Sequence, residues 1–388
     1  MKKAVWFFMV CLLILMTTAS SALAETLGFG YVNADNVAIR RGMGGKVIGR
    51  LPKDTCVWIK DTRTDNTGAL WYEINAGVHE NYSNYDYYGW MKAEFVDAGD
   101  ALWYDVVSFQ AAGNGIIVLR KDGTAQSGGG AVIAKDSSGW ISLRHWLEGI
   151  SGIHSVGVCD LGMENYAIDW KGKRYSTAAS DDTSREKIRV SGGRYWTFSI
   201  STDNQLMMGD CDFSWVWPRQ IRSEQLSHVI AIDDSFCRVL FLIDDGKLLV
   251  GRHLEDQFNM PEPDWENWTD LISIEASAAN FADPHGRYYS VYAGVRKDGS
   301  VIAAPEILED MIGNWQNMQK IVVAGTWVLG LRRDGTVITV GSNAPDVSGW
   351  TGITDVDAGY DYCVGLKENG TLIFAGDHVF IGDGHDRR

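Results

Sequence analysis

Pairs of neighbouring carboxylates are the residues of this chain that could do acid–base chemistry. Asp233 and Asp234 are adjacent, and Asp355 and Asp357 are two residues apart. Two carboxyl groups about 5–10 Å apart can act as the acid and the base or nucleophile of glycoside cleavage. In a chain with 50 acidic residues, however, such pairs are more often solvated loop residues. The sequence leaves this chemistry open and does not favour it.

Motifs of other catalytic classes are missing from the sequence. The eight His residues include no His-Glu-x-x-His and no pair at the spacing of helical metal ligands. There is no Gly-x-Ser-x-Gly elbow, no phosphate loop and no dinucleotide-binding glycine cluster. We therefore expect no catalytic residue, no metal and no cofactor.

Aromatic side chains form a candidate binding site. The segment from Asn75 to Tyr87 is rich in tyrosine, and Tyr88 adjoins it. Exposed tyrosines offer stacking area and a hydroxyl group at a small entropic cost, which suits a peptide or a sugar. The alternative is a long hairpin whose tyrosines pack on their own domain. The candidate ligand residues of this segment are Tyr82, Tyr85, Tyr87 and Tyr88.

The elements that position other candidate residues follow a repeat that begins near residue 101. Trp103, Trp315 and Trp350 each stand 20 residues before the glycine of an Asp-Gly or Asn-Gly turn. With weaker copies between them, the turns centre on residues 123, 172, 204, 246, 299, 335 and 370, about 41 residues apart on average. We expect each to be a type I′ hairpin turn, in which both central residues have positive φ.

Seven such units predict a β-propeller of seven blades over residues 101–378, with a Trp between neighbouring blades. A β-sandwich or a solenoid is the less favoured alternative. Residues that follow the Ala-Gly at the end of each inner strand would gather at one mouth of the ring, as a second candidate ligand site or as core between blades. They are Asn114, Arg194, Tyr195, Trp196, Asp234, Phe236, Thr326, Trp327, Tyr360 and Asp361.

These units resemble the repeats of the regulator of chromosome condensation family, in the divergent form of secreted bacterial proteins. The motifs are clearest in Gly330-Leu-Arg-Arg-Asp-Gly-Thr and Gly365-Leu-Lys-Glu-Asn-Gly-Thr. The resemblance implies the propeller fold. The founder of the family binds chromatin and acts in nucleotide exchange, but this chain is acidic and has Ile116, Val328 or Tyr362 where the family often has His. We do not expect those activities here.

A smaller unit over residues 28–98 precedes the repeat. Alternating apolar and polar residues between glycine turns predict short strands that form a small barrel. The segments Val37–Gly44, Val47–Thr55 and Gly89–Val96 resemble, in this order, the opening, middle and end of the bacterial SH3-like domain family. That resemblance implies a module that binds peptidoglycan or a peptide.

Residues 1–24 have the pattern of a secretory signal peptide. Lys2 and Lys3 precede an apolar run, and Ala22-x-Ala24 places the cleavage point between Ala24 and Glu25. An uncleaved anchor would need about 20 apolar residues. We expect a secreted or surface-associated protein, free of the membrane after signal removal, with a C-terminal tail at 379–388. Most of its five remaining cysteines should be small buried apolar residues.

The acidic balance of the chain narrows its partners. Asp and Glu number 50 against 35 Lys and Arg, a net charge of -15. Nucleic acids and anionic membranes bind through clustered cations, so neither is expected. The sequence predicts an all-β, secreted, noncatalytic binding protein, in which an SH3-like barrel docks on the cell wall or a peptide and a seven-bladed propeller presents a binding face. The expected partners are peptidoglycan, a surface glycan or an extracellular protein.

Two other functions stay open on the sequence alone. One is a divergent cell-wall or polysaccharide-active enzyme with its site in the propeller mouth, using Asp234 or Asp361. The other is a purely structural component of a surface assembly.

Overall fold

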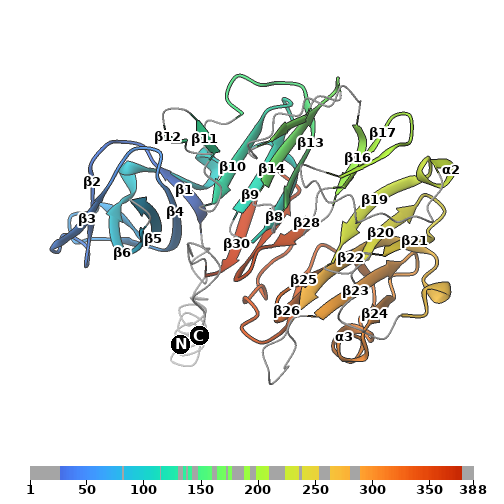
Figure 1. Ribbon diagram of the computed structural model, residues 1–388. Coiled ribbons are helices and arrows are strands. Elements are labelled where there is room, and N and C mark those ends of the chain that lie inside the picture. Colours follow the sequence, from blue (N-terminus) through green and yellow to red (C-terminus); the bar gives the residue numbers. More distant parts are fainter. Residues whose placement is uncertain are drawn as a thin grey trace, which may run out of the picture.

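In a computed structural model, the described residues form mainly antiparallel strands with few helices, which confirms the expected all-β class (Figure 1). The structure describes residues 27–80, 83–113, 115–129, 134–136, 139–141, 147–159, 164–171, 174–176, 188–192, 198–208, 223–235, 238–252, 263–279 and 289–377. The predicted signal peptide with Ala24 and Glu25 and the tail 379–388 lie outside these ranges. So do the candidate residues Tyr82, Asn114, Arg194, Tyr195, Trp196 and Phe236. Within the described ranges, no helix is long and apolar enough to cross a membrane.

The N-terminal unit is one seven-stranded sheet in the order β3-β2-β6-β5-β4-β1-β7. Leu51 on the first strand of this order and Val96 on the last belong to the same buried cluster, so the sheet curls around its own core. The strands are β1 (Gly28–Val32), β2 (Val37–Arg40), β3 (Val47–Leu51), β4 (Cys56–Thr64), β5 (Leu70–Glu80), β6 (Ser83–Lys92) and β7 (Val96–Asp97). Two short 3₁₀ helices, η1 (Ala93–Phe95) and η2 (Gly99–Ala101), lead out of the unit.

The described residues after Ala101 include seven three-stranded antiparallel sheets, numbered here in chain order. They are sheet 1, β8 (Val106–Ala112), β9 (Gly115–Arg120) and β10 (Ala125–Gly129); sheet 2, β13 (Ile153–Cys159), β14 (Glu164–Asp169) and β15 (Arg174–Ser176); sheet 3, β16 (Ile188–Gly192), β17 (Phe198–Ser201) and β18 (Leu206–Met208); sheet 4, β19 (Val229–Asp234), β20 (Arg238–Ile243) and β21 (Leu248–Arg252); sheet 5, β22 (Leu271–Ala279), β23 (Tyr289–Arg296) and β24 (Val301–Ala304); sheet 6, β25 (Met318–Ala324), β26 (Trp327–Arg332) and β27 (Val337–Gly341); and sheet 7, β28 (Ile353–Ala358), β29 (Tyr362–Lys367) and β30 (Leu372–Gly376).

Smaller elements connect these sheets. They are the hairpin of β11 (Ala134–Asp136) and β12 (Gly139–Ile141), the helices α2 (Ser223–Leu226) and α3 (Glu306–Ile312), and the 3₁₀ helix η4 (Trp265–Asn267).

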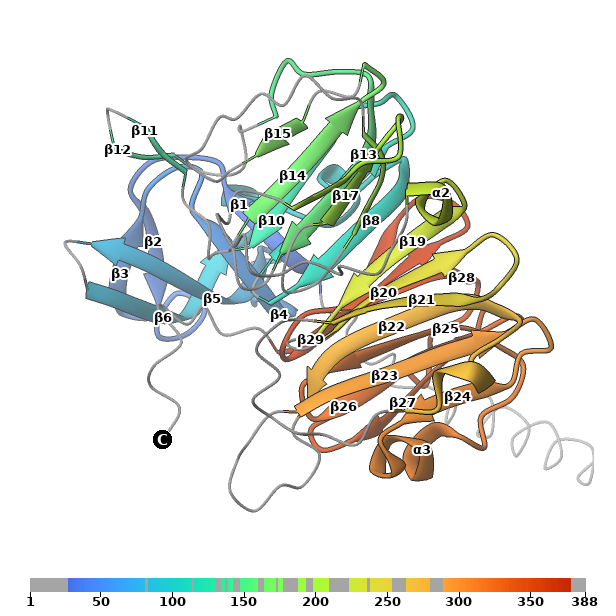
Figure 2. The same ribbon diagram turned by 45° about the vertical axis from the view of Figure 1, so that its right-hand side comes forward.

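The seven sheets follow one another around a ring. The first strand of each sheet, here called its inner strand, contacts the inner strand of the next sheet. Figure 2 shows β19, β22 and β25 in this succession. The inner strand β28 of sheet 7 also contacts β8 of sheet 1, so the succession closes on itself.

Six of the seven predicted turns lie in the described residues, between the second and third strands of their sheets, and their predicted type is wrong. The predicted turn at residue 172 lies outside the described residues. In the turn at Gly335, the N–H of Gly335 donates to the carbonyl of Arg332 at 3.0 Å. Positive φ is confined to Gly335, at 77°, which makes this a type I turn followed by a left-handed glycine. Asp334 favours this form because its Oδ1 accepts hydrogen bonds from the N–H and hydroxyl of Thr336, at 3.0 and 2.7 Å.

The five turn glycines of the described residues also join their sheets to the next ones. The carbonyl of Gly335 accepts a hydrogen bond from Ile353 N–H, at the start of β28, at 3.1 Å. A Cβ on Gly335 would lie 3.1 Å from that same nitrogen, so the close approach requires glycine. The equivalent bond from Val106 N–H to the carbonyl of Gly370, at 2.9 Å, joins sheet 1 to sheet 7.

Candidate functional site

The ring has two chemically different ends. In the described residues, five inner strands start beside a turn glycine of the preceding sheet, and we call this side the turn end. Each inner strand finishes at the loop that leads back into the middle strand, and we call this side the return end. The sequence-based candidates Trp327, Tyr360 and Asp361 belong to the return end.

A β-bulge follows the first residue of all seven inner strands, because the pairing register shifts between their first and third residues. A bulge leaves one extra residue outside the ladder and changes the direction of its side chain. Since the inner strands form a closed succession, these residues stand around the axis of the ring at its turn end. The bulge residues are Val107, His154, Arg189, Ile230, Ile272, Gln319 and Thr354.

Several bulge residues are exposed aliphatics. Val107 is 51% exposed, Ile230 55% and Ile272 40%. An isolated exposed aliphatic residue is ordinary, whereas the same position in three sheets forms a pattern. Gln319 is polar, and its Nε2 donates a hydrogen bond to the carbonyl of Thr354, the bulge residue of the next sheet, at 3.3 Å.

Aromatic side chains extend this surface over sheets 1 and 2. Trp170, directly after β14, is 78% exposed, and its ring lies 4.8 Å from that of His154 with an interplanar angle of 32°. Tyr104, just before β8, is 44% exposed, and the guanidinium of Arg120 lies 4.5 Å from its ring centroid. We call the following set the turn-end surface: Tyr104, Val107, His154, Trp170, Ile230 and Ile272.

Polar side chains of the inner strands join neighbouring sheets. Asp357 Oδ1 accepts a hydrogen bond from Ala358 N–H, and its Oδ2 accepts one from Ala111 N–H of sheet 1, both at 2.8 Å. In sheet 4, Asp233 makes the same two contacts, to Asp234 N–H at 2.9 Å and to sheet 5 at 2.8 Å. Two of the four carboxylates considered for acid–base chemistry therefore hold the ring together.

The same link is made with other acceptors in two further sheets. Glu275 Oε1 accepts a hydrogen bond from Val323 N–H of sheet 6 at 2.9 Å. Gln110 Oε1 accepts one from Val158 N–H of sheet 2 at 3.0 Å. The amide oxygen of Gln110 thus accepts the same hydrogen bond between sheets as the carboxylate of Glu275.

Lys320 is the basic residue among these carboxylates. Its Nζ lies 2.9 Å from Asp355 Oδ1 of the next sheet. Burial lowers the pKa of Lys320, but the negative charges of Asp355, Asp357 and Glu275 outweigh it and raise the pKa above its usual value. Lys320 therefore stays charged in a negative surrounding. No group of three His, Cys, Asp or Glu side chains in the described ranges could hold a metal ion.

At the return end, Trp327 is a core residue, so the alternative of core between blades holds for it. It is 2% exposed, packs between sheets 6 and 7, and donates from Nε1 to the carbonyl of Tyr360 at 3.3 Å. Tyr360 is 47% exposed and lies with half-buried Asp361 in the turn after β28. Asp234, which ends the inner strand β19 and was a candidate for acid–base chemistry, is fully buried.

The tyrosine-rich segment is an extension of the β5–β6 hairpin, paired as far as Glu80 with Ser83. Tyr87 belongs to the core cluster of the N-terminal sheet, and a Cβ on Gly49 would lie 2.5 Å from its ring. Packing on its own domain, the alternative given above, therefore holds for Tyr87. Tyr88 is 50% exposed and stays a candidate. Tyr85 lies in β6 opposite Val78, and its side chain is outside the described part.

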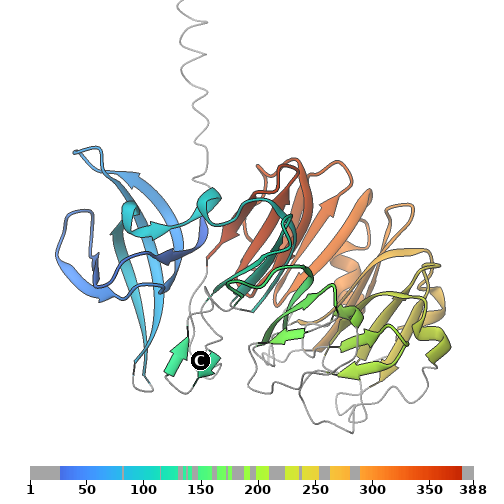
Figure 3. The same cartoon turned by 90° about the horizontal axis from the view of Figure 1, so that it is seen from above.

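The sequence did not indicate the joint between the two units, although it carries a signal for it. Strands β1 and β4 are apolar on both faces, as is typical of doubly covered strands. Val32, Val57 and Ile59 face the core of their own sheet. Phe29 and Trp58 belong instead to a cluster shared with sheets 1 and 7, and Figure 3 shows the N-terminal unit beside these two sheets.

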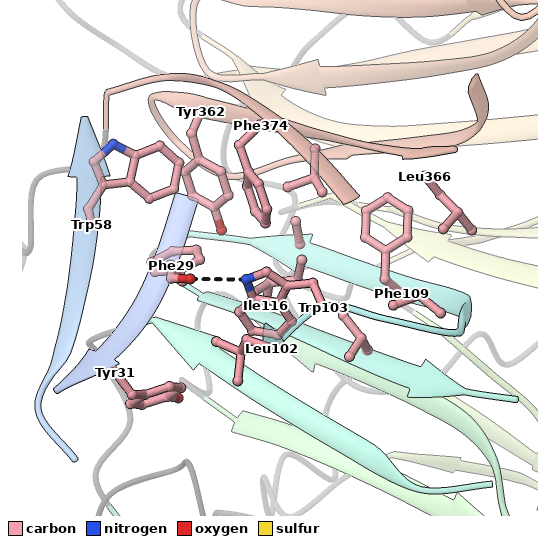
Figure 4. Close-up of a cluster of buried hydrophobic side chains, with 14 residues drawn as sticks. Phe29, Tyr31, Trp58, Leu102, Trp103, Phe109, Ile116, Tyr362, Leu366 and Phe374 are labelled. Atoms are coloured by element: carbon pink, nitrogen blue, oxygen red, sulfur yellow. Dashed lines mark hydrogen bonds between the residues drawn. The ribbon is translucent and has the colours of Figure 1, made fainter. Parts of the chain in front are cut away.

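The joint is largely aromatic (Figure 4). The ring of Phe29 lies 5.0 Å from that of Trp58 and 5.4 Å from that of Tyr362, both edge to face. Trp103 Nε1 donates to the carbonyl of Phe29 at 3.0 Å, and the hydroxyl of Tyr31 donates to Ser127 of β10 at 2.7 Å. These contacts fix the N-terminal unit where the first and last sheets of the ring meet.

Two of the five expected cysteines are described as free thiols. Cys363 is buried in the ring, as anticipated, and burial raises the pKa of its thiol. Cys56 lies in the joint, where its Sγ accepts a hydrogen bond from Gly129 N–H at 3.2 Å. Burial raises the pKa of Cys56 to about 12.

No protein-family model and no curated protein matches the chain. Solved structures are similar to it at low identity, among them the following three. Prp20p from Saccharomyces cerevisiae, studied for its binding to Gsp1p and histones, is 13% identical with a TM-score of 0.44, over 72% of this chain and 83% of that one. The ectodomain of the Physcomitrella patens receptor kinase CR4 is 12% identical with a TM-score of 0.43, over 71% and 74%. The β-propeller domain of Myceliophteria thermophila Cps50 (Swd1) is 8% identical with a TM-score of 0.39, over 71% and 97%. At these scores we transfer no residue, partner or activity to this chain.

Proposed function

We propose that the chain is a secreted, noncatalytic binding protein whose ring presents a surface to a protein partner. In this proposal residues 101–378 form a seven-bladed propeller of regulator of chromosome condensation type, and residues 28–98 form an SH3-like barrel. The closed succession of seven three-stranded sheets supports the first assignment. The second is supported by the N-terminal sheet, which curls around a single core.

One observation carries the binding function. The inner-strand carboxylates Asp233 and Asp357 are bound to backbone N–H groups, whereas the exposed side chains beside them are aliphatic or aromatic. Exposed Trp, Tyr and Ile with a neighbouring Arg are the composition of protein interfaces, in which a few large side chains supply most of the affinity. Such a surface favours association over turnover.

Export and attachment to the cell wall are further parts of the proposal. The leader pattern of residues 1–24 supports export. Exposed Tyr88 on the β5–β6 hairpin supports contact of the N-terminal unit with peptidoglycan or a peptide. Because the joint fixes the two units together, attachment through one would hold the other at the surface.

The test uses the full chain without residues 1–24, immobilised and exposed to purified peptidoglycan and to solubilised envelope proteins. We expect saturable retention of an envelope protein in a stoichiometric amount, and no turnover on a panel of cell-wall and capsular polysaccharides. A Tyr88→Ser variant separates binding by the N-terminal unit, because it should weaken only retention on peptidoglycan.

Two results would contradict the proposal. One is the absence of saturable retention on either material. The other is polysaccharide turnover that Asp234→Asn or Asp361→Asn abolishes, which would establish the enzymatic alternative.

A further inference from the structure

The exposed apolar side chains of the ring are unevenly distributed between its ends. Among its described residues, the large exposed apolar side chains are Tyr104, Val107, Trp170, Ile230, Ile272 and Tyr360. Five of these lie at the turn end, and Tyr360 lies at the return end. Clustered exposed apolar area marks interaction sites, because a soluble protein otherwise keeps such patches small.

Seven aligned bulges give the turn end a common construction. Each bulge keeps a side chain out of the ladder at the same height around the axis. Ile230 and Ile272 come from the adjacent sheets 4 and 5, and Val107 and His154 come from the adjacent sheets 1 and 2. Trp170 extends the second pair outward through its contact with His154. The surface is therefore built from positions that the ring repeats.

Acidic side chains lie directly behind this surface. Lys320 and Asp355 follow the bulge residues of sheets 6 and 7 in the chain. Three more carboxylates lie three residues after the bulge residues of their own inner strands, and they belong to Asp233, Glu275 and Asp357. Three of these carboxylates, Asp355, Asp357 and Glu275, act on the single ammonium group of Lys320, and their excess negative charge favours a cation that approaches the turn end.

We infer that the turn-end surface is the docking face of the protein, and that it takes a protein segment in which Lys or Arg side chains stand among aliphatic residues. The inference rests on the proposed binding function and names its face and the chemistry of its partner. The aliphatic residues of the segment pack on Ile230, Ile272 and Val107, while its cation is attracted by the carboxylates behind them. The raised pKa of Lys320 supports this, because the same carboxylates stabilise the charge of Lys320 against its burial.

The probe is a fluorescein-labelled peptide of alternating Leu and Lys, titrated with the full mature chain and followed by fluorescence anisotropy. Two matched peptides, one of Leu and Glu and one of Ser and Lys, separate the apolar from the ionic contribution. We expect saturable binding of the Leu-Lys peptide, at least about tenfold weaker binding of the other two, and weaker binding at higher salt.

Exposed positions supply the variants, since their substitution leaves the core intact. Ile230→Ser combined with Ile272→Ser, and separately Trp170→Ser, should each weaken binding of the Leu-Lys peptide about tenfold or more. Tyr360→Ser is the matched control, because Tyr360 is about as exposed but lies at the return end. Glu275→Gln should weaken binding severalfold while the fold is kept, because Gln110 shows that an amide oxygen makes the same link.

Three results would overturn the inference: no saturable binding of the Leu-Lys peptide, equal binding of the Leu-Glu peptide, or equal losses in Tyr360→Ser and the turn-end variants. Failure here differs from failure of the proposed function. An envelope protein that is still retained by the turn-end variants would leave the binding function in place and remove this face from it.

Discussion

Replacing Phe29 by Ala tests whether the joint makes the N-terminal unit and the ring one cooperative body. Phe29 is fully buried between Trp58 and Tyr362. Removing a buried Phe side chain costs about 3–5 kcal/mol, as lost transfer free energy plus the cavity that remains. Edge-to-face aromatic pairs add about 0.5–1.5 kcal/mol each, and rigid neighbouring rings cannot collapse into the space. We therefore expect a loss at the upper end of this range, about 5 kcal/mol in the free energy of unfolding.

Two measurements follow the change. Urea denaturation monitored by circular dichroism gives the free energy of unfolding, and a single transition in the parent chain should separate into two in Phe29→Ala. Alkylation of Cys56 at pH 8, located by peptide mass spectrometry, reports opening of the joint. With a pKa of about 12, only about one in 10⁴ of these thiols is ionised, against about a quarter for an exposed cysteine. Alkylation should therefore be at least tenfold faster in the variant.

The matched control is Tyr88→Ala in the same unit, which removes a half-exposed aromatic side chain and should change stability by about 0.5 kcal/mol or less. A loss below about 1 kcal/mol in Phe29→Ala, with unchanged alkylation of Cys56, would refute the joint as a source of stability.

Three further changes test the ring and one turn of the N-terminal unit. Gly335→Ala should lower the free energy of unfolding by about 1–3 kcal/mol in urea denaturation, because it combines a positive φ with a close backbone neighbour, whereas Gly349→Ala, with open space around it, should not. Asp357→Ala leaves two backbone N–H groups without their acceptor and should cost about 2–4 kcal/mol in the same assay, against almost nothing for exposed Asp310→Ala. Hydrogen bonds from a Thr and a Trp lower the pKa of Asp65 from 3.8 to about 2. The contribution of Asp65 to stability is therefore complete above about pH 4 and is lost as the pH falls towards 2. Asp65→Asn should reduce the acid sensitivity of the melting temperature between these pH values, and an unchanged pH profile would contradict this.

The repeated architecture could be predicted because two separate structural requirements keep glycine at the turn positions. The glycine at 335 must have positive φ and must let the next sheet approach, so residue type and spacing both persist along the chain. One related signal was overlooked. The residue before the inner strand is also left-handed in five sheets. In four of them it stands two residues after a Trp, which makes the motif Trp-x-Asp/Asn/Gly more specific than Trp-x-x. The five left-handed residues are Asp105, Gly152, Asp270, Asn317 and Gly352.

The candidate site was harder to predict for a physical reason. A bulge depends on the pairing of two strands, so the sequence of one strand does not reveal that Ile230 is turned out of the ladder. An Ile in an apolar strand is typical of core, just as Trp327 after a loop is typical of a surface aromatic. Tertiary packing decides both positions, and it leaves Ile230 exposed and buries Trp327.

The position of the joint explains why the N-terminal unit belongs to this ring. Consecutive sheets are linked by the chain as well as by contacts, whereas sheets 7 and 1 meet only through noncovalent contacts. Besides the inner-strand links, the hydroxyl of Tyr362 donates to the carbonyl of Gly115 across this closure at 2.7 Å. The joint adds Phe29, which packs on Tyr362 and Phe374 of sheet 7, while its carbonyl accepts from Trp103 of the segment that enters sheet 1. An opening of the ring would separate these partners, so the N-terminal unit stabilises the closure that lacks a covalent link and keeps the turn-end residues of sheet 1 in register with the rest of the ring.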